Sequence, residues 1–270
     1  MADDLSHAPT TGLHTQLCGD AHLSNFGLFA TPERTLAFDV NDFDETYPGP
    51  FEWDVKRLVA SLAVAGRVNG FSRKQRKRIA RACAAEYRET MSYQAERGEL
   101  AVWYSHIDAA AQLDEYRDVL DSSTRKRVRK TIDKSRGRDS VQALSKLTTL
   151  VDGQPRIVST PPLIVPIEEI FTDTEAEQLD REMIRRLRDY RETLQSARRL
   201  LFDRFEYVQT ARKVVGVGSV GTRAWIVLLR GPGADPLFLQ AKEAGPSVLE
   251  KYVDGPAFTN QANASSPGNA

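Results

Sequence analysis

Residues 19–25 read Gly-Asp-Ala-His-Leu-Ser-Asn, and residues 38–44, farther along the chain, read Phe-Asp-Val-Asn-Asp-Phe-Asp. The first segment offers a carboxylate, Asp20, followed by an amide, Asn25, and the second offers another carboxylate, Asp42. A carboxylate can accept the proton of a hydroxyl group, and Mg²⁺ takes oxygen ligands. Asp20 is therefore a candidate general base, and Asn25 and Asp42 are candidate ligands of Mg²⁺. The alternative is that all three residues only cap turns, as Asp and Asn often do.

Asp54 follows in the segment Pro-Gly-Pro-Phe-Glu-Trp-Asp-Val-Lys-Arg-Leu, at the start of a helical apolar pattern. This layout resembles kinase-type phosphotransferases, and in particular the aminoglycoside and choline phosphotransferase branch. There a Gly-Asp-x-x-x-x-Asn loop precedes Asp-Phe and then a helix that begins with Trp-Asp or Tyr-Asp. That branch usually has His before Gly-Asp, where this chain has Cys18. The resemblance implies that Asp20 is the general base and that Asn25 and Asp42 bind Mg²⁺. It also implies ATP and Mg²⁺ as cofactors, a hydroxyl of a small molecule or protein as acceptor, and a buried Asp54 that accepts backbone N–H groups of the loop.

The stretch from Gln16 to Ala65 is also similar to the bacterial family catalogued as domain of unknown function 2252, which has been grouped with kinase-like folds. The similarity extends from Leu13 to about Glu250 and includes the segments Lys146-Leu147-Thr148 and Pro161-Pro162-Leu163. Members of that family are longer at both ends. We therefore expect this chain to be a piece of a longer family member.

A glycine-rich segment, Val-Gly-Val-Gly-Ser-Val-Gly, occupies residues 215–221. The β-branched and aromatic residues at 222–229 predict a strand after it, whereas a dinucleotide fingerprint would open a helix. In kinases a glycine-rich loop covers the ATP phosphates and a lysine on a later strand reaches them. The expected nucleotide-binding residues are Gly216, Gly218, Ser219, Gly221, Lys242 and Glu250. Glu243 is the alternative carboxylate for orienting the lysine, and a plain tight hairpin is the alternative for the whole segment.

The order of the two motifs bears on the fold. In ordinary kinases the glycine-rich loop precedes the catalytic loop, whereas here it follows, so either the fold is a permuted kinase-like one or one motif is a coincidence. We expect a mostly helical α+β fold with a short N-terminal β-hairpin region and a C-terminal antiparallel three-stranded sheet. The expected domains are a catalytic-loop and helical region at 1–205, the small sheet with its glycine-rich loop at 206–253, and a disordered tail at 254–270.

Periodicity and capping signals place the helices of the first region. Ser72 with Gln75 forms a capping-box pattern for a long helix that ends near Glu96. Further helices are expected at 99–118, 122–135, 139–150 and 173–204. The proline-containing segment 152–166 is expected to be a turn followed by an extended connector.

Composition limits the classes of protein. The chain has 270 residues, 41% of them hydrophobic, and a formal net charge of zero. No apolar run is long enough to cross a bilayer, so we expect a cytoplasmic protein without a membrane partner. The two cysteines are too few for a disulfide framework. The basic runs at 73–78 and 125–130 lack interleaved aromatic residues and fit the polar faces of helices, which disfavours a nucleic-acid partner. The oligomeric state is not predicted.

The net charge of zero conceals an acidic N-terminal segment. Residues 1–54 carry ten carboxylates and a single cation, Arg34. Asp39, Asp42 and Asp44 would repel one another unless a cation lies among them, and Mg²⁺ is the simplest one. The alternative is a solvated acidic turn that faces basic helices.

Three functions remain open. The leading one is a kinase-like phosphotransferase that moves phosphate from ATP-Mg to a hydroxyl acceptor. The second is a catalytically silent nucleotide-binding or interaction module, which a truncated family member would be. The third is a metal-dependent phosphoesterase, because Asp20-Ala21-His22 resembles the Asp-x-His metal pair of such enzymes. For His22 the alternative is a structural role within the loop.

Overall fold

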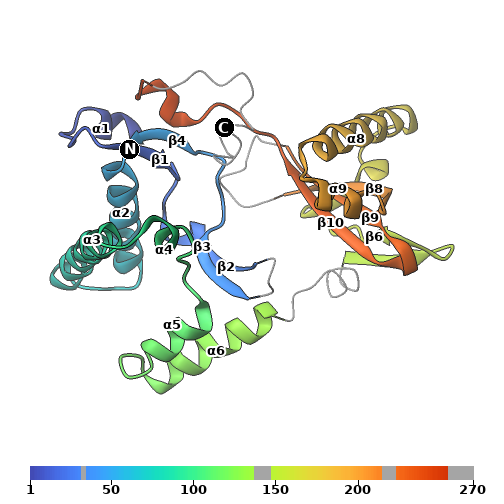
Figure 1. The fold of residues 1–270 in the computed structure, drawn as a ribbon. Coiled ribbons are helices and arrows are strands. Elements are labelled where there is room, and N and C mark those ends of the chain that lie inside the picture. Colours follow the sequence, from blue (N-terminus) through green and yellow to red (C-terminus); the bar gives the residue numbers. More distant parts are fainter. Residues whose placement is uncertain (32–34, 137–146, 215–222, 255–270) are drawn as a thin grey trace. The chain divides into compact units, whose positions relative to one another are not determined.

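The chain folds into two compact units, each described by itself. The computed structural model describes residues 1–31, 35–136, 147–214 and 223–254. Unit 1 comprises Met1–Arg136 together with Ala244–Ala270, and unit 2 comprises Gly137–Glu243. Helices and antiparallel strands occur in both units, so the fold is α+β, as expected (Figure 1).

Two strand pairs form the β structure of unit 1. Strand β1 (His14–Leu17) pairs antiparallel with β4 (Tyr47–Pro50), with Leu17 opposite Tyr47. Strand β2 (Phe26–Ala30) pairs antiparallel with β3 (Leu36–Val40). The segment that follows β1 (residues 18–25) and the segment that follows β3 (residues 41–46) therefore lie next to each other.

Helices surround these strands. They are α1 (Ala2–Ser6), η1 (Leu23–Asn25), α2 (Glu52–Val68), α3 (Arg73–Ala95), α4 (Glu99–Trp103), α5 (Ala109–Glu115), α6 (Ser122–Arg136) and η5 (Val248–Lys251). The capping box at the start of α3 is confirmed, with the Ser72 hydroxyl accepting from the Gln75 amide. The single helix expected at 99–118 is wrong, because Asp108 accepts hydrogen bonds from Ala110 and Ala111 and begins a separate helix there.

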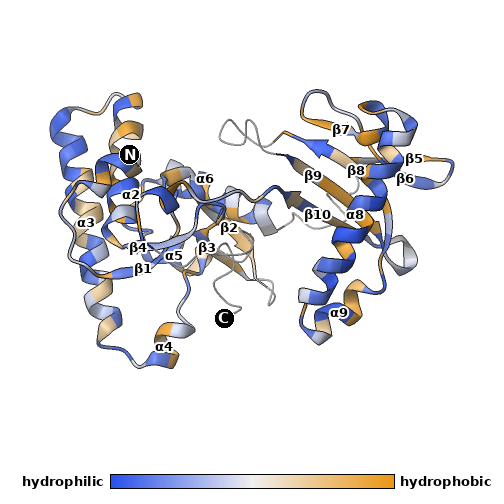
Figure 2. Ribbon diagram, turned by 90° about the horizontal axis from the view of Figure 1, so that it is seen from above, coloured by the Kyte–Doolittle hydropathy of each residue, from blue (hydrophilic) through white to orange (hydrophobic). Residues whose placement is uncertain are grey.

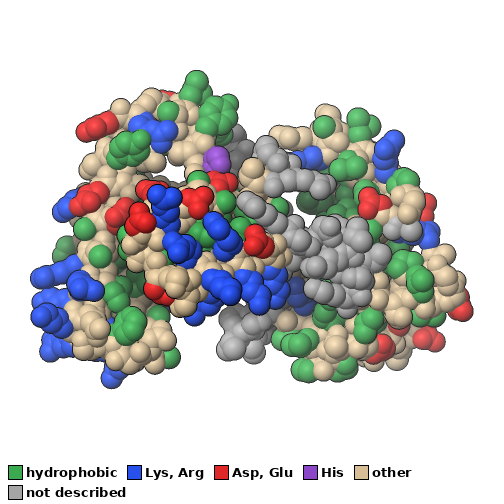
Figure 3. Space-filling view, turned by 90° about the horizontal axis from the view of Figure 1, so that it is seen from below, with side chains coloured by type: hydrophobic (Ala, Val, Ile, Leu, Met, Phe, Trp, Pro, Cys, Tyr) green, Lys and Arg blue, Asp and Glu red, His purple; other side chains and the backbone are tan. Residues whose placement is uncertain are grey.

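Two apolar clusters support unit 1. Leu17, Tyr47, Trp53 and Leu249 are buried against one another, so β1, β4, α2 and η5 share a core. A second cluster joins β3 to α5 and α6 through Leu36, Ala109, Leu113 and Ile132. The opposite face of α6 carries exposed Lys126, Arg127, Arg129 and Lys130, and Figure 3 shows basic side chains gathered there. Within the described ranges no helix combines the length and apolar composition that a bilayer span requires.

Unit 2 is built on a four-stranded antiparallel sheet in the order β10-β9-β8-β7. Its strands are β7 (Ile164–Pro166), β8 (Glu206–Lys213), β9 (Ala224–Arg230) and β10 (Pro236–Lys242). The expected three strands were therefore one too few. The added edge strand, β7, has only three residues and ends on proline, so it lacks the length and alternation by which a strand is recognised in a sequence.

The region before this sheet also differs from the expectation. Strands β5 (Thr148–Val151) and β6 (Gln154–Ile157) form a hairpin, where the sequence indicated the end of a helix and a connector. Asp152 and Gly153 both have positive φ angles, which a two-residue hairpin loop requires. Residues 137–146, which carry most of the helix expected at 139–150, lie outside the described residues.

Strand β9 lies at the centre of unit 2 and is buried on both faces. Trp225, Val227 and Leu229 pack toward α8 (Asp173–Thr193), whereas Ile226 and Leu228 pack toward Ile157 of β6 on the other face. Figure 2 shows the hydrophobic colour concentrated on this strand. The helix expected at 173–204 is interrupted at Leu194, whose backbone is extended, and α9 (Ser196–Phe202) follows. The remaining short helices are η2 (Ile167–Glu169) and η4 (Pro232–Ala234).

A partly buried polar contact joins α8 to the sheet. The Tyr207 hydroxyl donates to the Asp180 carboxylate and lies 2.8 Å from the Thr210 hydroxyl. Burial raises the pKa of Asp180, and the Tyr207 hydrogen bond opposes that rise. Burial and the hydrogen bond to Asp180 both raise the pKa of Tyr207 well above its usual range. The phenol therefore stays protonated and remains the donor.

We predict that Tyr207→Phe lowers the free energy of unfolding by about 1–3 kcal/mol, because the half-buried Asp180 carboxylate loses its donor. Chemical denaturation followed by circular dichroism measures this. Tyr190→Phe is the matched control, since Tyr190 is largely exposed and its ring contacts Phe202. Equal effects of the two substitutions would show that the hydroxyl of Tyr207 contributes nothing specific.

Candidate functional site

The loop that follows β1 is shaped by a glycine that no other residue can replace without strain. Gly19 has a φ of 81°, in the left-handed region that favours glycine. A Cβ atom at this position would lie 1.9 Å from the Glu45 carbonyl oxygen. Both the backbone conformation and the close approach of the two segments therefore require glycine immediately before Asp20.

Helix α2 holds the start of the loop through one carboxylate. The two oxygens of Asp54 accept hydrogen bonds from the backbone N–H groups of Cys18, at 2.7 Å, and Gly19, at 3.1 Å. This is the contact that the resemblance implied for Asp54, although the side chain is half-buried rather than fully buried. Burial raises the pKa of Asp54, the two backbone N–H groups lower it, and the charge of Asp20 adds to the rise.

The same helix holds the rest of the loop. The Arg57 guanidinium donates from Nε, at 3.0 Å, and from Nη2, at 2.6 Å, to Oδ1 of Asp20. One further turn along, the Ser61 hydroxyl accepts from the Leu23 backbone N–H at 3.0 Å. Residues spaced by three and four positions share one face of a helix. The face formed by Asp54, Arg57 and Ser61, which we call the α2 clamp, therefore contacts the loop from Cys18 to Leu23.

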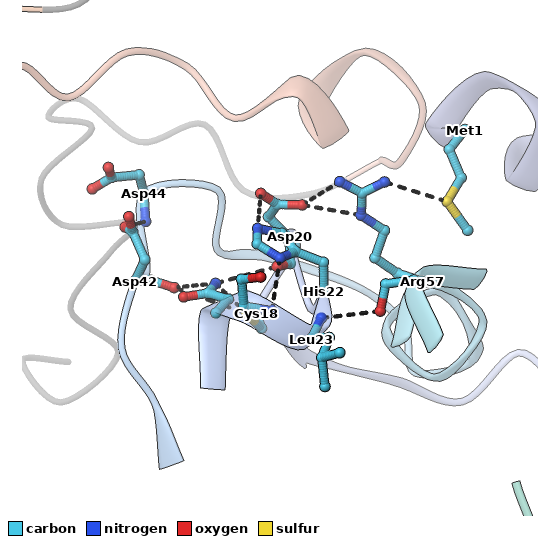
Figure 4. Close-up of polar contacts among 12 residues, drawn as sticks. Met1, Cys18, Asp20, His22, Leu23, Asp42, Asp44 and Arg57 are labelled. Carbon is cyan, nitrogen blue, oxygen red and sulfur yellow. Dashed lines mark hydrogen bonds and ion pairs between the residues drawn. The ribbon is translucent and has the colours of Figure 1, made fainter. Parts of the chain in front are cut away.

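His22 completes the surroundings of the Asp20 carboxylate (Figure 4). Its Nε2 lies 3.4 Å from Asp20 Oδ2, and its Nδ1 accepts from the Ser24 backbone N–H at 3.2 Å. The hydrogen bond to Nδ1 assigns the proton of the neutral ring to Nε2, which faces Asp20. Both ring nitrogens thus serve contacts within the loop.

Asn25 joins the two segments that the sequence singled out. It is buried, with 6% of its surface exposed. Its Nδ2 donates to the backbone carbonyls of Asp20, at 3.2 Å, and Asp42, at 3.0 Å. The Asp42 carboxylate accepts from the Asp44 backbone N–H at 3.2 Å, and Figure 4 shows it directed toward that residue. Asn25 and Asp42 are therefore neighbours, and the observed contact is made by the backbone of Asp42.

Cys18 directly precedes Gly19 and Asp20 in the sequence. Its thiol makes weak contacts with the side chain of Asn25 and the backbone carbonyl of Asp42. Asn25 Nδ2 lies 3.6 Å from its sulfur, and the thiol faces the Asp42 carbonyl at 3.9 Å. Burial, and then the negative charge of Asp54, raise the pKa of Cys18 to about 11. The thiol stays protonated at neutral pH and is a poor nucleophile.

A cavity of about 300 Å³ opens beside the Asp20 carboxylate. Its walls come from the N-terminal residues around α1, from the loop, from the segment before β4, from α2 and from the segment around η5. The residues on these walls include Asp20, Glu45, Trp53, Asp54, Arg57 and Leu249. Three carboxylates and one guanidinium therefore line a space large enough for a small molecule.

The η5 segment is fastened to the loop region by Glu45. Its carboxylate accepts from the Val248 backbone N–H at 2.8 Å and lies 3.2 Å from the Ser247 hydroxyl. The same hydroxyl lies 2.9 Å from the Glu45 backbone carbonyl. Residues far apart in the sequence thus close one side of the cavity.

The other expected site residues have different surroundings. Gly216, Gly218, Ser219 and Gly221 lie outside the described residues. Lys242 ends β10 in unit 2, whereas Glu250 lies on η5 in unit 1. Within the described part of the chain, the Glu250 Oε1 atom is buried without a hydrogen-bond partner. The carboxylate of Glu243 pairs with the Arg223 guanidinium at 3.1 Å.

The residues around Asn25 can offer Mg²⁺ oxygen ligands. The amide nitrogen of Asn25 faces the two carbonyls, so its amide oxygen faces away from them, and the carboxylates of Asp20 and Asp42 lie on the two adjoining segments. Among the residues described, no three His, Cys, Asp or Glu side chains converge as a metal site. A magnesium ion bound by few protein ligands keeps waters and takes phosphate oxygens as well, which suits this sparse set.

Sequence reasoning missed Arg57, Ser61 and Glu45. The first two were detectable, because they follow Asp54 at helical spacing and so share its face. The role of Glu45 was not detectable, since its partners lie about two hundred residues away in the chain.

A comparison with protein-family models matched residues 1–267 to the family described as "Uncharacterized protein conserved in bacteria (DUF2252)". The chain belongs to the DUF2252 family. No curated protein and no solved structure matched it. Membership covers both units and includes the loop, the α2 clamp and the cavity.

We predict slow alkylation of Cys18 in the folded protein, measured in a Cys83→Ser variant so that one thiol reports. With a pKa of about 11, the thiolate is scarce at pH 8 and iodoacetamide should react on the order of a hundredfold more slowly than with a free thiol. An unfolded cysteine ionises near pH 8.5. Ionisation therefore favours the unfolded state, and stability should fall as pH rises from about 8.5 toward 11. The urea-unfolded variant is the control, and equal rates in both states would contradict the prediction.

Proposed function

We propose that this protein is a kinase-like phosphotransferase that moves phosphate from ATP-Mg to the hydroxyl group of an acceptor. The proposal is carried by the position of Asp20, whose half-exposed carboxylate stands at the wall of the cavity on a loop fixed by the α2 clamp. Phosphoryl transfer demands little covalent chemistry of the protein and depends mostly on positioning. A carboxylate held in this way can orient an acceptor hydroxyl and accept its proton.

The surroundings of Asp20 support the role of a base. Arg57 contacts Oδ1 alone, and Oδ2 faces His22 at the longer distance of 3.4 Å. One carboxylate oxygen is thus fixed by a bidentate donor while the other keeps acceptor capacity.

The nucleotide would be bound by two further sets of residues. Asn25 and Asp42 would hold Mg²⁺, which when bound neutralises charge on the phosphates. Lys242 and the segment Gly216–Gly221 would contact the phosphates, as the resemblance to kinases implies. This assignment requires a kinase-like fold in permuted order, because Asp20 precedes Lys242 in the chain.

One observation favours the second candidate, a nucleotide-binding module without transfer activity. The ion pair with Arg57 occupies Oδ1 of Asp20, one of the two oxygens of the carboxylate that would act as base. In an active enzyme the acceptor hydroxyl must reach Oδ2 while this ion pair persists. For the third candidate, a phosphoesterase, His22 would have to give up its contacts with Asp20 and Ser24 to bind metal.

Replacing the two carboxylates separates transfer from binding. Asp20→Asn should lower the rate of phosphate transfer by about 10²–10⁴ and leave ATP affinity nearly unchanged, because the base acts on the acceptor. Asp42→Asn should weaken Mg²⁺-dependent ATP binding as well, because it removes a metal ligand. Transfer from radiolabelled ATP and calorimetric titration with ATP-Mg measure the two effects. Asp118→Asn, an exposed carboxylate on the turn before α6, is the control.

The outcomes distinguish the candidates. ATP binding without any transfer, in wild type and Asp20→Asn alike, would favour the silent module. Absence of both binding and transfer, in protein shown to be folded by circular dichroism, would overturn the phosphotransferase proposal.

A further inference from the structure

Two strands of the unit 2 sheet end on lysines that share one face. Arg212 of β8 pairs with Trp225 of β9, so the next residue, Lys213, comes level with Ala224. Ala224 in turn pairs with Lys242 of β10. Cross-strand neighbours in an antiparallel sheet point to the same face. Lys213 and Lys242 therefore flank a small alanine side chain from either side.

The side chains next to these lysines on the same face of the sheet are apolar. Ala211, Ile226 and Leu228 occupy the same face of β8 and β9 and are buried together with Ile157. Lys213 is half-buried above this cluster, and its Nζ lies 3.1 Å from the Gln240 side-chain oxygen. The neutral side chain of Gln240 holds the Lys213 ammonium group in place without compensating its positive charge.

Glu243 follows Lys242 and binds Arg223 through both side-chain and backbone contacts. No ion pair of Lys213 with a carboxylate occurs among the residues that the structure describes. Burial and the positive charge of Lys242 both lower the pKa of Lys213. The two ammonium groups repel each other, and an anion bound between them would relieve that repulsion.

We propose that Lys213 and Lys242 together form a binding site for the phosphate groups of a nucleotide di- or triphosphate, with Lys213 as a phosphate contact in addition to Lys242. Their strands are separated by β9, so the two backbones lie roughly 10 Å apart. A pair of cations at that spacing matches an extended polyanion better than a single carboxylate. The inference rests on the proposed function, because the ligand that it names is the polyphosphate of the proposed nucleotide.

Titration of the full chain with inorganic tripolyphosphate tests the site without a nucleoside or an acceptor. Isothermal titration calorimetry should show binding to the wild type that Lys213→Met weakens about tenfold, as expected for the loss of one charge-assisted hydrogen bond. Lys213→Arg keeps the charge and should retain most of the affinity. Lys77→Met, which removes an exposed lysine from α3 in unit 1, is the matched control and should bind like the wild type.

A second measurement uses the unaltered protein, so that misfolding of a variant cannot imitate the result. An amine-reactive reagent and peptide mass spectrometry report the labelling of each lysine. Saturating tripolyphosphate should protect Lys213 and Lys242 at least several-fold and leave Lys77 unprotected. Labelling of Lys213 that is unchanged by tripolyphosphate, or equal affinity of the wild type and folded Lys213→Met, would overturn the inference.

The result is separable from the proposed function. Protection of Lys213 in a protein that never transfers phosphate would uphold the site and remove the phosphotransferase. If Lys213→Met transfers phosphate with full activity and tripolyphosphate does not protect Lys213, the phosphotransferase proposal stands and the Lys213 site is ruled out.

Discussion

The hydrogen bonds from the backbone of Cys18 and Gly19 to the Asp54 carboxylate are the contact on which the site in unit 1 depends. A carboxylate that accepts two backbone N–H groups fixes the direction of the chain as well as its position. From there Arg57 meets Asp20 and Ser61 meets Leu23, one helical turn after another. The loop is consequently held by a rigid helix along its length, which is how a catalytic side chain can be presented in one orientation.

Contacts of Glu45 bring the walls of the cavity together beside Asp20. Gly19 lets the loop approach Glu45 closely, and Glu45 binds the segment at Ser247 and Val248. The walls are therefore tied together by hydrogen bonds between segments that are remote in sequence. The lining combines charged side chains with the apolar side chains of Trp53 and Leu249, as small-molecule sites usually do.

The contacts of the loop could be inferred from the sequence better than the distant segments that pack around it. The resemblance implied the hydrogen bonds of Asp54, which are confirmed, and the capping box at Ser72 was legible because it depends on neighbouring residues. Strand β7 escaped prediction because three residues show no periodicity, and the role of Glu45 because its partners are distant. Arg57 was visible in the helical spacing but carried no motif. The metal and nucleotide assignments stay predictions.

Native-state hydrogen exchange at the Cys18 and Gly19 amides tests the central claim most directly, since it measures whether α2 holds the loop in solution. We expect both amides to be strongly protected in the wild type and to exchange at least about tenfold faster in Asp54→Asn, which loses one acceptor oxygen. Glu86→Gln, at an exposed position of α3, should leave both rates unchanged. Exchange as fast as in an unstructured peptide, or protection that is unaltered by Asp54→Asn, would contradict the account.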